Sequence, residues 1–413
     1  MAVVLNELFF PKTDPHLAQL LSATAFCTTF VFRPFGALIF GYIGDTIGRK
    51  TSVVITTILS AISCAAMAIL PTYDQIGITA SWLFILCRIT QGLCSMGEIM
   101  GALIYLTELI KIPERYPIVT FIGCADFLGT LAALAVTTAV LSAGLEWRVA
   151  FWFGALIAII GTVARTALRE TPEFVNAKHR LKKKLEKTNV VDSSLILKKN
   201  FIVNEKVNQK TSLSYFFIQC SRPISFYFMY VYCANILMHS FNYSAQQVVQ
   251  HNLIVTTVEF LVILVNAYLS YKINPLKIVN VRLIISAIFI VFVPYLLNNI
   301  TTVMDLLLIQ IFMCLFKPAA APAAAIFFVH FPVFKRFTYS SFLYALSRAL
   351  MYVVTSFGVV YLTKIFGHWG LLIIFIPMFI GFKFGIIHFE RLEKEAENDP
   401  QNISLNLVAN TVV

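Results

Sequence analysis

Long apolar runs alternate with short polar connections along most of the chain. A transmembrane α-helix needs about 20 mostly apolar residues to cross the hydrocarbon core of a bilayer. The runs lack the ten-residue alternation of a transmembrane barrel, and lipid satisfies no backbone groups, so helices are the structure that fits them. Eleven such runs occur, at 16–44, 52–71, 81–110, 116–143, 147–168, 213–240, 247–271, 279–299, 302–327, 338–363 and 367–388.

Composition supports a membrane protein and excludes several other classes. Of the 413 residues, 58% are hydrophobic and only 13% are charged, whereas soluble domains average about 45–50% apolar and about 25% charged residues. The net charge is +11, but the basic residues gather in the segment 169–212 and in short clusters between apolar runs. That distribution is typical of cytoplasmic loops and not of a nucleic-acid-binding face. Soluble enzymes, secreted disulfide scaffolds, disordered proteins and nucleic-acid-binding proteins are therefore excluded.

The positions of lysine and arginine also predict the orientation of the helices. Alternate connections carry them, at 49–50, 111–115, 169–212, 272–282 and 335–336, whereas the intervening connections hold only Lys364. We expect the first set, and the C-terminus, to be cytoplasmic. The predicted organisation is an N-terminal helical half at 1–168, a basic cytoplasmic loop at 169–212, a C-terminal helical half at 213–388 and a tail at 389–413. The run at 16–44 would then begin outside, so we expect residues 1–10 to be the outer end of a preceding first helix that is truncated, which leaves eleven full spans.

The chain shows no signature of enzymatic chemistry or of a cofactor. Its eight cysteines all fall within apolar runs, without CxxC or Cys/His spacing, and are expected to behave as small apolar side chains. There is no Walker or GxGxxG sequence, no catalytic triad and no zinc-ligand spacing. We therefore expect neither a metal site, nor a cofactor, nor an enzyme.

The run at 81–110 carries a polar stripe. Arg88, Gln91, Ser95 and Glu98 are separated by 3, 4 and 3 residues, which places them on one face of a helix, with Tyr105 further along. Ionisable residues in spans usually face the bundle interior or an aqueous path. Glu98 could carry a proton, because a carboxylate that loses water binds a proton more readily. Alternatively, these side chains make structural bonds to neighbouring helices.

Further charged side chains interrupt other apolar runs. Asp126, in GCADFLGT, could pair with Arg88 or Arg33, or could bind substrate or a proton. Arg222 and Arg348 could grip a substrate carboxylate through two hydrogen bonds each. Salt bridges to Glu98, Asp126 or Glu259 are the alternative for these arginines, and Lys317 is another charge within a span.

The connection GYIGDTIGRK is the sharpest local motif. Its glycines permit a tight turn and close packing between helices, and its opposite charges can contact the terminus of a neighbouring helix. The candidate residues of this gating loop are Gly41, Asp45, Gly48, Arg49 and Lys50.

This connection resembles the loop 2–3 signature of the major facilitator superfamily, G-x-x-x-D-x-x-G-R-[KR]. The stripe RITQGLCSMGE is similar to the span-4 motif of that superfamily in its metabolite:proton symporter branch. FFPKTDP, RPFGALIFG, EWRVAFW, RETPEF and HFPVFKRFTYSS also resemble that branch, and bacterial proline/betaine transporters in particular. The resemblance is dense from residue 8 to about 175 and thinner from 213 to 388.

The resemblance implies a twelve-helix carrier with two six-helix halves, which alternates its access and uses the proton gradient. It also implies that Asp45, Arg49 and Lys50 form a cytoplasmic latch and that Arg88 and Glu98 take part in coupling. The chain departs from the pattern at Tyr271, where the second copy of the latch usually has an aspartate.

We therefore predict an importer of a small zwitterionic or carboxylate metabolite, with a proline/betaine-type osmolyte as the substrate, in the bacterial inner membrane. Glu98, then Asp126, with Arg88, would couple protons, and Arg33, Gln91, Arg222 and Arg348 would bind substrate. Substrate, protons and the bilayer are the expected partners of a monomer. A dicarboxylate carrier, an exporter or facilitator, and a transport-inactive copy or sensor on the same scaffold remain the alternatives.

Overall fold

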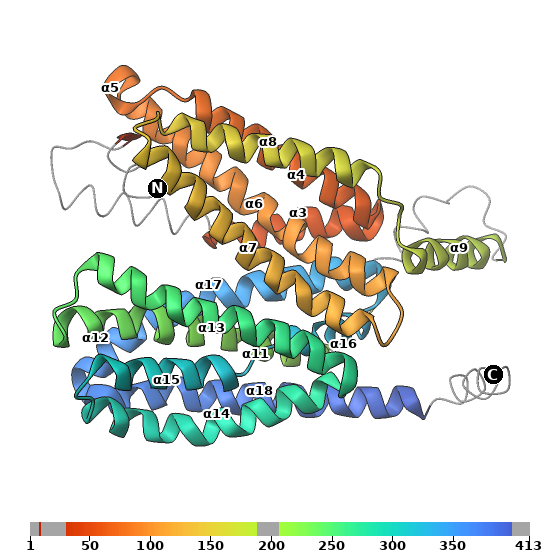
Figure 1. Cartoon of the computed structure of the whole chain (residues 1–413). Helices are drawn as coiled ribbons and strands as arrows, with labels where there is room; N and C mark the ends of the chain where they lie inside the picture. The colour runs from red at the N-terminus through yellow and green to blue at the C-terminus, as the bar shows by residue number, and fades with distance from the viewer. Residues whose placement is uncertain (1–7, 10–29, 188–205, 399–413) are drawn as a thin grey trace. The chain divides into compact units, whose positions relative to one another are not determined.

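The computed structural model describes residues 8–9, 30–187 and 206–398, which are helical with short connections (Figure 1). Contacts between Cα atoms divide the chain into two compact units. Unit 1 comprises Met1–Lys111, Ile122–Lys206 and Pro332–Ala349, and unit 2 comprises Ile112–Phe121, Val207–Phe331 and Leu350–Val413. Two helices, α7 (Arg115–Ser142) and α17 (Val333–Phe366), contribute a part to each unit.

Unit 1 is built around α4, which packs against both α6 and α8, while α3 packs against α4 and α6 (Figure 1). The approach of α3 to α6 depends on Gly36, because a Cβ atom at this position would lie 2.6 Å from the Cα atom of Leu93. The complete helices of this unit are α3 (Arg33–Thr46), α4 (Arg49–Ile69), α5 (Tyr73–Ile76), α6 (Ile78–Leu109), α8 (Arg148–Thr166) and α9 (Pro172–Lys187).

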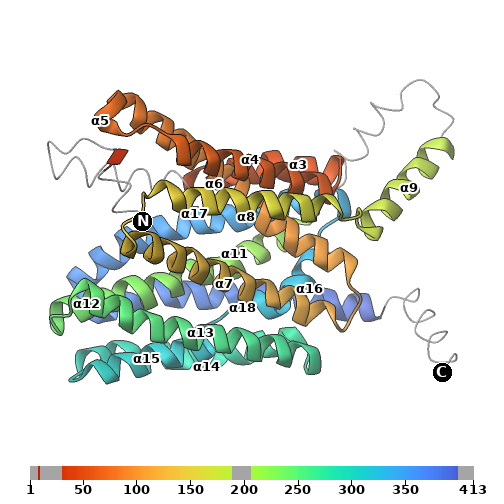
Figure 2. The ribbon, with the colours of Figure 1, turned by 45° about the horizontal axis from the view of Figure 1, so that its top comes forward.

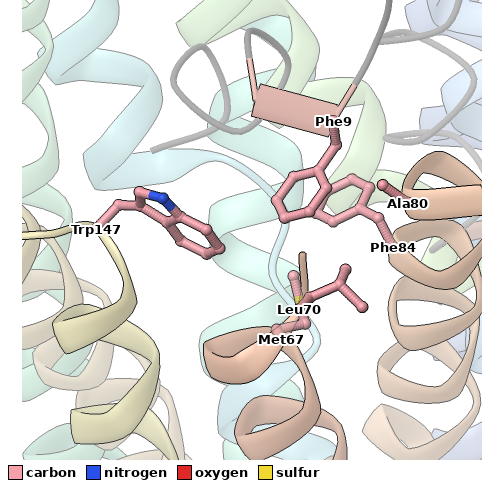
Figure 3. Packing of buried hydrophobic residues seen from close by; sticks show 6 residues of the cluster. All are labelled: Phe9, Met67, Leu70, Ala80, Phe84 and Trp147. Carbon is pink, nitrogen blue, oxygen red and sulfur yellow. The ribbon is translucent and has the colours of Figure 1, made fainter. Parts of the chain in front are cut away.

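One end of unit 1 is closed by an aromatic core (Figure 3). The ring of Phe9 stacks on Phe84 with 4.8 Å between centroids and meets the edge of Trp147 at 5.5 Å. Burying a large apolar side chain contributes roughly 1.5–3 kcal/mol. This core therefore ties the segment at residues 8–9 to α4, α6 and the beginning of α8. Its buried members are Phe9, Met67, Leu70, Ala80, Phe84 and Trp147.

In unit 2, α11 packs against α18, α13 against α15, and α14 against both α15 and α18 (Figure 2). Polar residues at the start of several helices accept hydrogen bonds from backbone N–H groups that have no intrahelical partner. Ser244, Asn274 and Thr302 cap three helices in this way. The elements are α11 (Gln209–Phe226), η1 (Tyr227–Tyr232), α12 (Cys233–Ser240), α13 (Ala245–Lys272), α14 (Pro275–Asn298), α15 (Val303–Phe316), η2 (Ala321–Ala323), α16 (Ala324–Val329), η3 (Gly367–Trp369) and α18 (Gly370–Glu397).

The structure corrects the expected span at 302–327, which is not one continuous helix. α15 ends at Phe316, and the chain continues through the short 3-10 turn η2 into α16. Pro318 and Pro322 lack the N–H that a continuing helix requires, and the residue before a proline avoids helical backbone angles. Lys317 accordingly adopts φ −50° and ψ 141°.

The expected helix at 16–44 lies in part outside the described residues, because only 30–44 of it are described. The remaining apolar runs correspond to helical segments whose ends differ by up to nine residues from the predicted ones. The run predicted over 52–71 is α4, and the run predicted over 116–143 is α7. Among the described residues, eight helical segments are long and apolar enough to cross a membrane. The basic segment 169–212, treated above as a loop, contains the helix α9.

Candidate functional site

The segment from the second half of α3 to the start of α4 requires glycine at two positions. Gly48 has a φ of 155°, and the Glu170 carboxylate occupies the place where a Cβ atom would be. A Cβ atom at Gly41 would lie 2.6 Å from the Cα atom of Thr338, so this glycine lets α3 approach the start of α17. The glycines of the motif thus permit a sharp turn and a close helix contact.

Asp45, near the end of α3, is buried against the N-terminal part of α17. Its carboxylate accepts hydrogen bonds from the backbone N–H groups of Phe337 (3.0 Å) and Thr338 (2.8 Å). Phe337 and Thr338 are the fifth and sixth residues of α17, so the carboxylate lies close to the positive end of the helix dipole. The contact between Asp45 and a helix terminus is therefore present, while its role in gating stays a prediction.

Arg49 is fully buried and joins several elements of unit 1. Its Nη2 lies 2.9 Å from Oε1 of Glu108, and its Nε donates to Oε2 of the same carboxylate at 3.0 Å. It also donates to the carbonyls of Gly44 (2.7 Å) and Val333 (2.6 Å). This forked contact with one carboxylate is strong and fixes the direction of the guanidinium.

Arg336 completes the group that we call the latch cluster. Its Nη1 lies 2.9 Å from Glu108, and its Nη2 lies 2.9 Å from Glu173 at the start of α9. Lys50 is half-buried beside the cluster, and within the described residues its side chain makes no ion pair with it. The members of the latch cluster are Asp45, Arg49, Glu108, Glu173 and Arg336.

Sequence reasoning did not identify Glu108 and Glu173 as parts of this site. Glu108 lies near the end of α6, just before a basic connection, and Glu173 lies at the start of α9, in the quoted stretch RETPEF. An acid close to a basic connection could have been recognised in the sequence as a candidate partner for the arginine of the motif. Their pairing with Arg336 lay beyond that signal, because Glu108 and Arg336 are 228 residues apart.

The polar stripe of α6 faces α4. The Glu98 carboxylate accepts a hydrogen bond from the Ser60 hydroxyl at 2.8 Å. Gln91 lies 3.3 Å from the sulfur of Met67 and accepts from Arg88 at 3.3 Å. Arg88, Gln91 and Glu98 are all half-buried.

Arg165 on α8 is a cation near Glu98 that sequence reasoning did not single out. It interacts electrostatically with the Glu98 carboxylate and donates a hydrogen bond to the Thr57 hydroxyl. The structure therefore places three helices, α4, α6 and α8, around this acid.

The remaining predicted residues are dispersed. Asp126 is exposed on α7, and Arg33 lies at the start of α3 with its guanidinium 4.4 Å from the centroid of Phe30. Arg348 is buried, stacks on the ring of Tyr344 and donates to the Tyr344 carbonyl at 3.2 Å. Arg222 is exposed on α11 in unit 2. These four residues lie on four different helices, α3, α7, α11 and α17.

Unit 2 contains a second group of charges around Glu259. Its carboxylate lies 2.6 Å from the Lys317 ammonium and accepts a hydrogen bond from the Tyr230 hydroxyl at 2.8 Å. Arg222 and Arg282 also interact electrostatically with it. Among the residues that the structure describes, no cluster of His, Cys, Asp and Glu could hold a metal ion.

Comparison with known proteins agrees with this architecture. The sequence profile of the Major Facilitator Superfamily matches residues 8–355. The chain is 34% identical to the proline/betaine transporter of Escherichia coli K12 over 181 residues, which are 42% of this chain and 36% of that protein. The chain thus matches little more than a third of the length of this curated relative.

Solved structures show the same fold at low sequence identity. The proton:xylose symporter XylE of E. coli aligns over 95% of this chain and 90% of its own, with a TM-score of 0.71 and 15% identity. The human organic anion transporter MFSD10 aligns over 89% of this chain and 84% of its own, with a TM-score of 0.61 and 16% identity. The chain is a multi-pass membrane protein of a transporter fold and not an enzyme, and it belongs to the major facilitator superfamily.

Proposed function

We propose that the chain is a secondary active transporter that imports a small carboxylate-bearing metabolite together with protons by alternating access. The family and the fold support transport as the activity. The name of the E. coli relative suggests a zwitterion of the proline or betaine type. Carriers of this architecture bind their substrates near the bilayer midplane between two repeats and switch access by rocking.

Glu98 carries the proton coupling in this proposal. It lies within a long apolar helix, and its observed hydrogen bond comes from a neutral hydroxyl, that of Ser60. A carboxylate held away from water binds protons more readily than an exposed one, while the nearby Arg165 favours its charged form. Arg88 is directed to Gln91 rather than to this acid, so it would tune the site indirectly. Asp126 is the second candidate.

The latch cluster supplies the switch between access states. It joins the α3–α4 turn and the end of α6 to the first two turns of α17, through residues far apart in the sequence. Charged hydrogen bonds of this kind contribute roughly 1.5–3 kcal/mol each. Opening the cluster therefore requires a compensating gain, which substrate and proton binding would provide. Gly41, Gly48 and Lys50 would support the turn that holds it.

Substrate binding is assigned to polar side chains of the spans. Gln91 offers an amide on the α6 stripe, and Arg33 lies near the start of α3. Arg222 and Arg348 are the guanidinium groups proposed to meet the carboxylate, for which a planar fork of donors is well suited.

Uptake measurements test the proposal most directly. Cells that lack their own carriers would express the chain and receive labelled proline, glycine betaine or succinate, with and without a protonophore. We expect protonophore-sensitive accumulation of at least one substrate, and we expect Glu98→Gln to reduce it about tenfold or more. The matched control is Glu146→Gln, because Glu146 is an exposed acid of the same unit. Unchanged accumulation and pH dependence in Glu98→Gln would remove this acid from the coupling mechanism.

A further inference from the structure

The interruption after α15 places a lysine at the end of a short helix inside a predicted span. α15 has 14 residues and ends just before Lys317, whose backbone N–H still closes the helix on the Met313 carbonyl at 2.7 Å. Helices broken at membrane depth are tolerated where the backbone lines a cavity, and they are typical of transporter binding sites. The positive side chain is also favourable beside the negative end of the helix dipole.

Neighbouring elements hold this lysine against Glu259. The ammonium of Lys317 lies 2.6 Å from the carboxylate, and Tyr230 of the π-helical segment η1 donates to the same carboxylate at 2.8 Å. The π-helix is itself anchored, because the Gln310 amide donates to the Met229 carbonyl at 2.6 Å. Single π-helical turns inside α-helices occur frequently at functional sites. The pair is only partly shielded, with 13% of the lysine side chain and 26% of the glutamate side chain exposed.

Positive charge exceeds negative charge around this pair. Arg222 and Arg282 interact electrostatically with the same carboxylate that binds Lys317. Arg282 is 6% exposed, its Nη2 donates to the Cys314 carbonyl at 3.3 Å, and no described residue accepts a hydrogen bond from its Nε or Nη1. Buried cations without full compensation are costly in a membrane. Lys317 and the buried Arg282 face one carboxylate between them, which leaves room for a further anion.

We propose that the group formed by Arg222, Glu259, Arg282 and Lys317 binds the carboxylate of an anionic substrate. Among the small carboxylate-bearing metabolites of the proposed function, the substrate is then one with a net negative charge, such as a dicarboxylate, and not a zwitterion. This inference rests on the proposed function, because it names the substrate class of the same carrier.

Glu259 acts in this arrangement as the resting counter-ion of Lys317. When a substrate carboxylate arrives, it competes with Glu259 for the ammonium and takes up donors of Arg282. A zwitterion would bring its own ammonium close to Lys317 and Arg282, and like charges repel. The excess positive charge therefore discriminates between the two substrate classes.

Binding measurements on the purified full chain test the inference separately from transport. Succinate and 2-oxoglutarate would be titrated by calorimetry, with proline and glycine betaine as zwitterionic probes. We expect the dicarboxylates to bind and the zwitterions to bind at least about tenfold more weakly. Lys317→Met should weaken dicarboxylate binding about tenfold or more, equivalent to about 1.4 kcal/mol. Lys383→Met is the matched control, because the Lys383 ammonium is bonded to Asn280 at 2.8 Å and not to this group.

A second variant distinguishes a binding role from a purely structural ion pair. Glu259→Gln removes the competing carboxylate while the amide keeps the shape of the side chain, so dicarboxylate affinity should rise about threefold to tenfold. A structural pair would instead lose affinity in both variants, which would overturn the inference. Lys317→Arg retains the charge and should keep measurable binding if Lys317→Met fails to fold.

Transport in the same preparations separates the two proposals. Dicarboxylate binding without protonophore-sensitive uptake would support this site and contradict the proposed function. Protonophore-sensitive uptake of glycine betaine or proline, with no binding of either dicarboxylate, would support the proposed function and overturn the inference.

Discussion

The two copies of the loop motif, one in each half of the sequence, are held by different interactions. In unit 1 the motif after α3 carries Asp45 and Arg49, and both side chains are buried. Arg49 donates hydrogen bonds to the Glu108 carboxylate, and Asp45 accepts one from the backbone N–H of Thr338. In unit 2 the turn after α13 has Tyr271 and Pro275 at the corresponding places in the motif. Only the first turn combines an acid at a helix N-terminus with a buried arginine.

The second turn is held by helix capping. The Asn274 side chain accepts a hydrogen bond from the N–H of Leu276 at 2.9 Å, and Pro275 begins α14 where no N–H is needed. Tyr271 is exposed, with the Lys272 ammonium 5.4 Å from its ring centroid. A capped turn favours one local conformation, whereas a cluster of charges can be opened and closed by a change in its partners. We therefore predict that the first copy, and not the second, gates access.

Removing the arginine of the first copy should have the largest effect. Arg49→Ala leaves the Glu108 carboxylate buried with part of its compensation gone, and breaking a buried ion pair on one side costs about 3–5 kcal/mol. We expect the free energy of unfolding, measured in mixed micelles, to fall by about that amount. Pro275→Ala, the change at the corresponding position in unit 2, should cost less than about 1 kcal/mol, because no charge loses its partner.

Arg49→Lys provides the control for this experiment. It keeps the charge but loses the forked donors that reach Glu108 and Val333 together. Its stability should therefore lie between those of the original chain and Arg49→Ala. Equal losses of stability in Arg49→Ala and Pro275→Ala would show that the two turns do not differ as described.

The latch shows how far the sequence could predict this site. Asp45 was expected to contact a helix terminus because an acid beside a glycine turn suits the exposed N–H groups of a first helical turn. Which terminus it contacts could not be deduced, since Asp45 and Phe337 are separated by 292 positions and no local pattern links them. In contrast, apolar length predicted α4 and α7 well, because helix formation in a membrane depends on local composition.

The interrupted span after α15 was missed for a different reason. The run at 302–327 is mostly apolar despite Asp305 and Lys317, and its length favours a continuous helix more than the backbone requirements of Pro318 and Pro322 oppose one. The proximity of Lys317 to Glu259 follows from that interruption together with the packing of α13 against α15. Each charge was visible in the sequence, but their association depends on tertiary structure.

Removing the acid of the first copy should have the next largest effect. Asp45→Ala leaves the N–H groups of Phe337 and Thr338 without their acceptor, which weakens the latch by at least one charged hydrogen bond, about 1.5–3 kcal/mol. We expect initial uptake rates to fall about tenfold at an unchanged amount of protein in the membrane. Tyr271→Ala is the matched change in unit 2 and should stay within about twofold of the original rate. Similar rates in both variants would contradict the assignment of gating to unit 1.

The smallest effect is expected at the cap of the second copy. Asn274→Ala removes the acceptor for the Leu276 N–H, and losing such a cap typically costs about 1 kcal/mol. Asn274→Asp keeps an acceptor at the same place and adds a negative charge at the start of α14, which the helix dipole favours. We expect the alanine variant to unfold more easily in mixed micelles and the aspartate variant to match or exceed the original stability, with uptake rates unchanged in both. If Asn274→Asp altered the rate, a single acid would be enough to give the second turn a gating role, and the difference between the two copies would depend on one residue rather than on two kinds of construction.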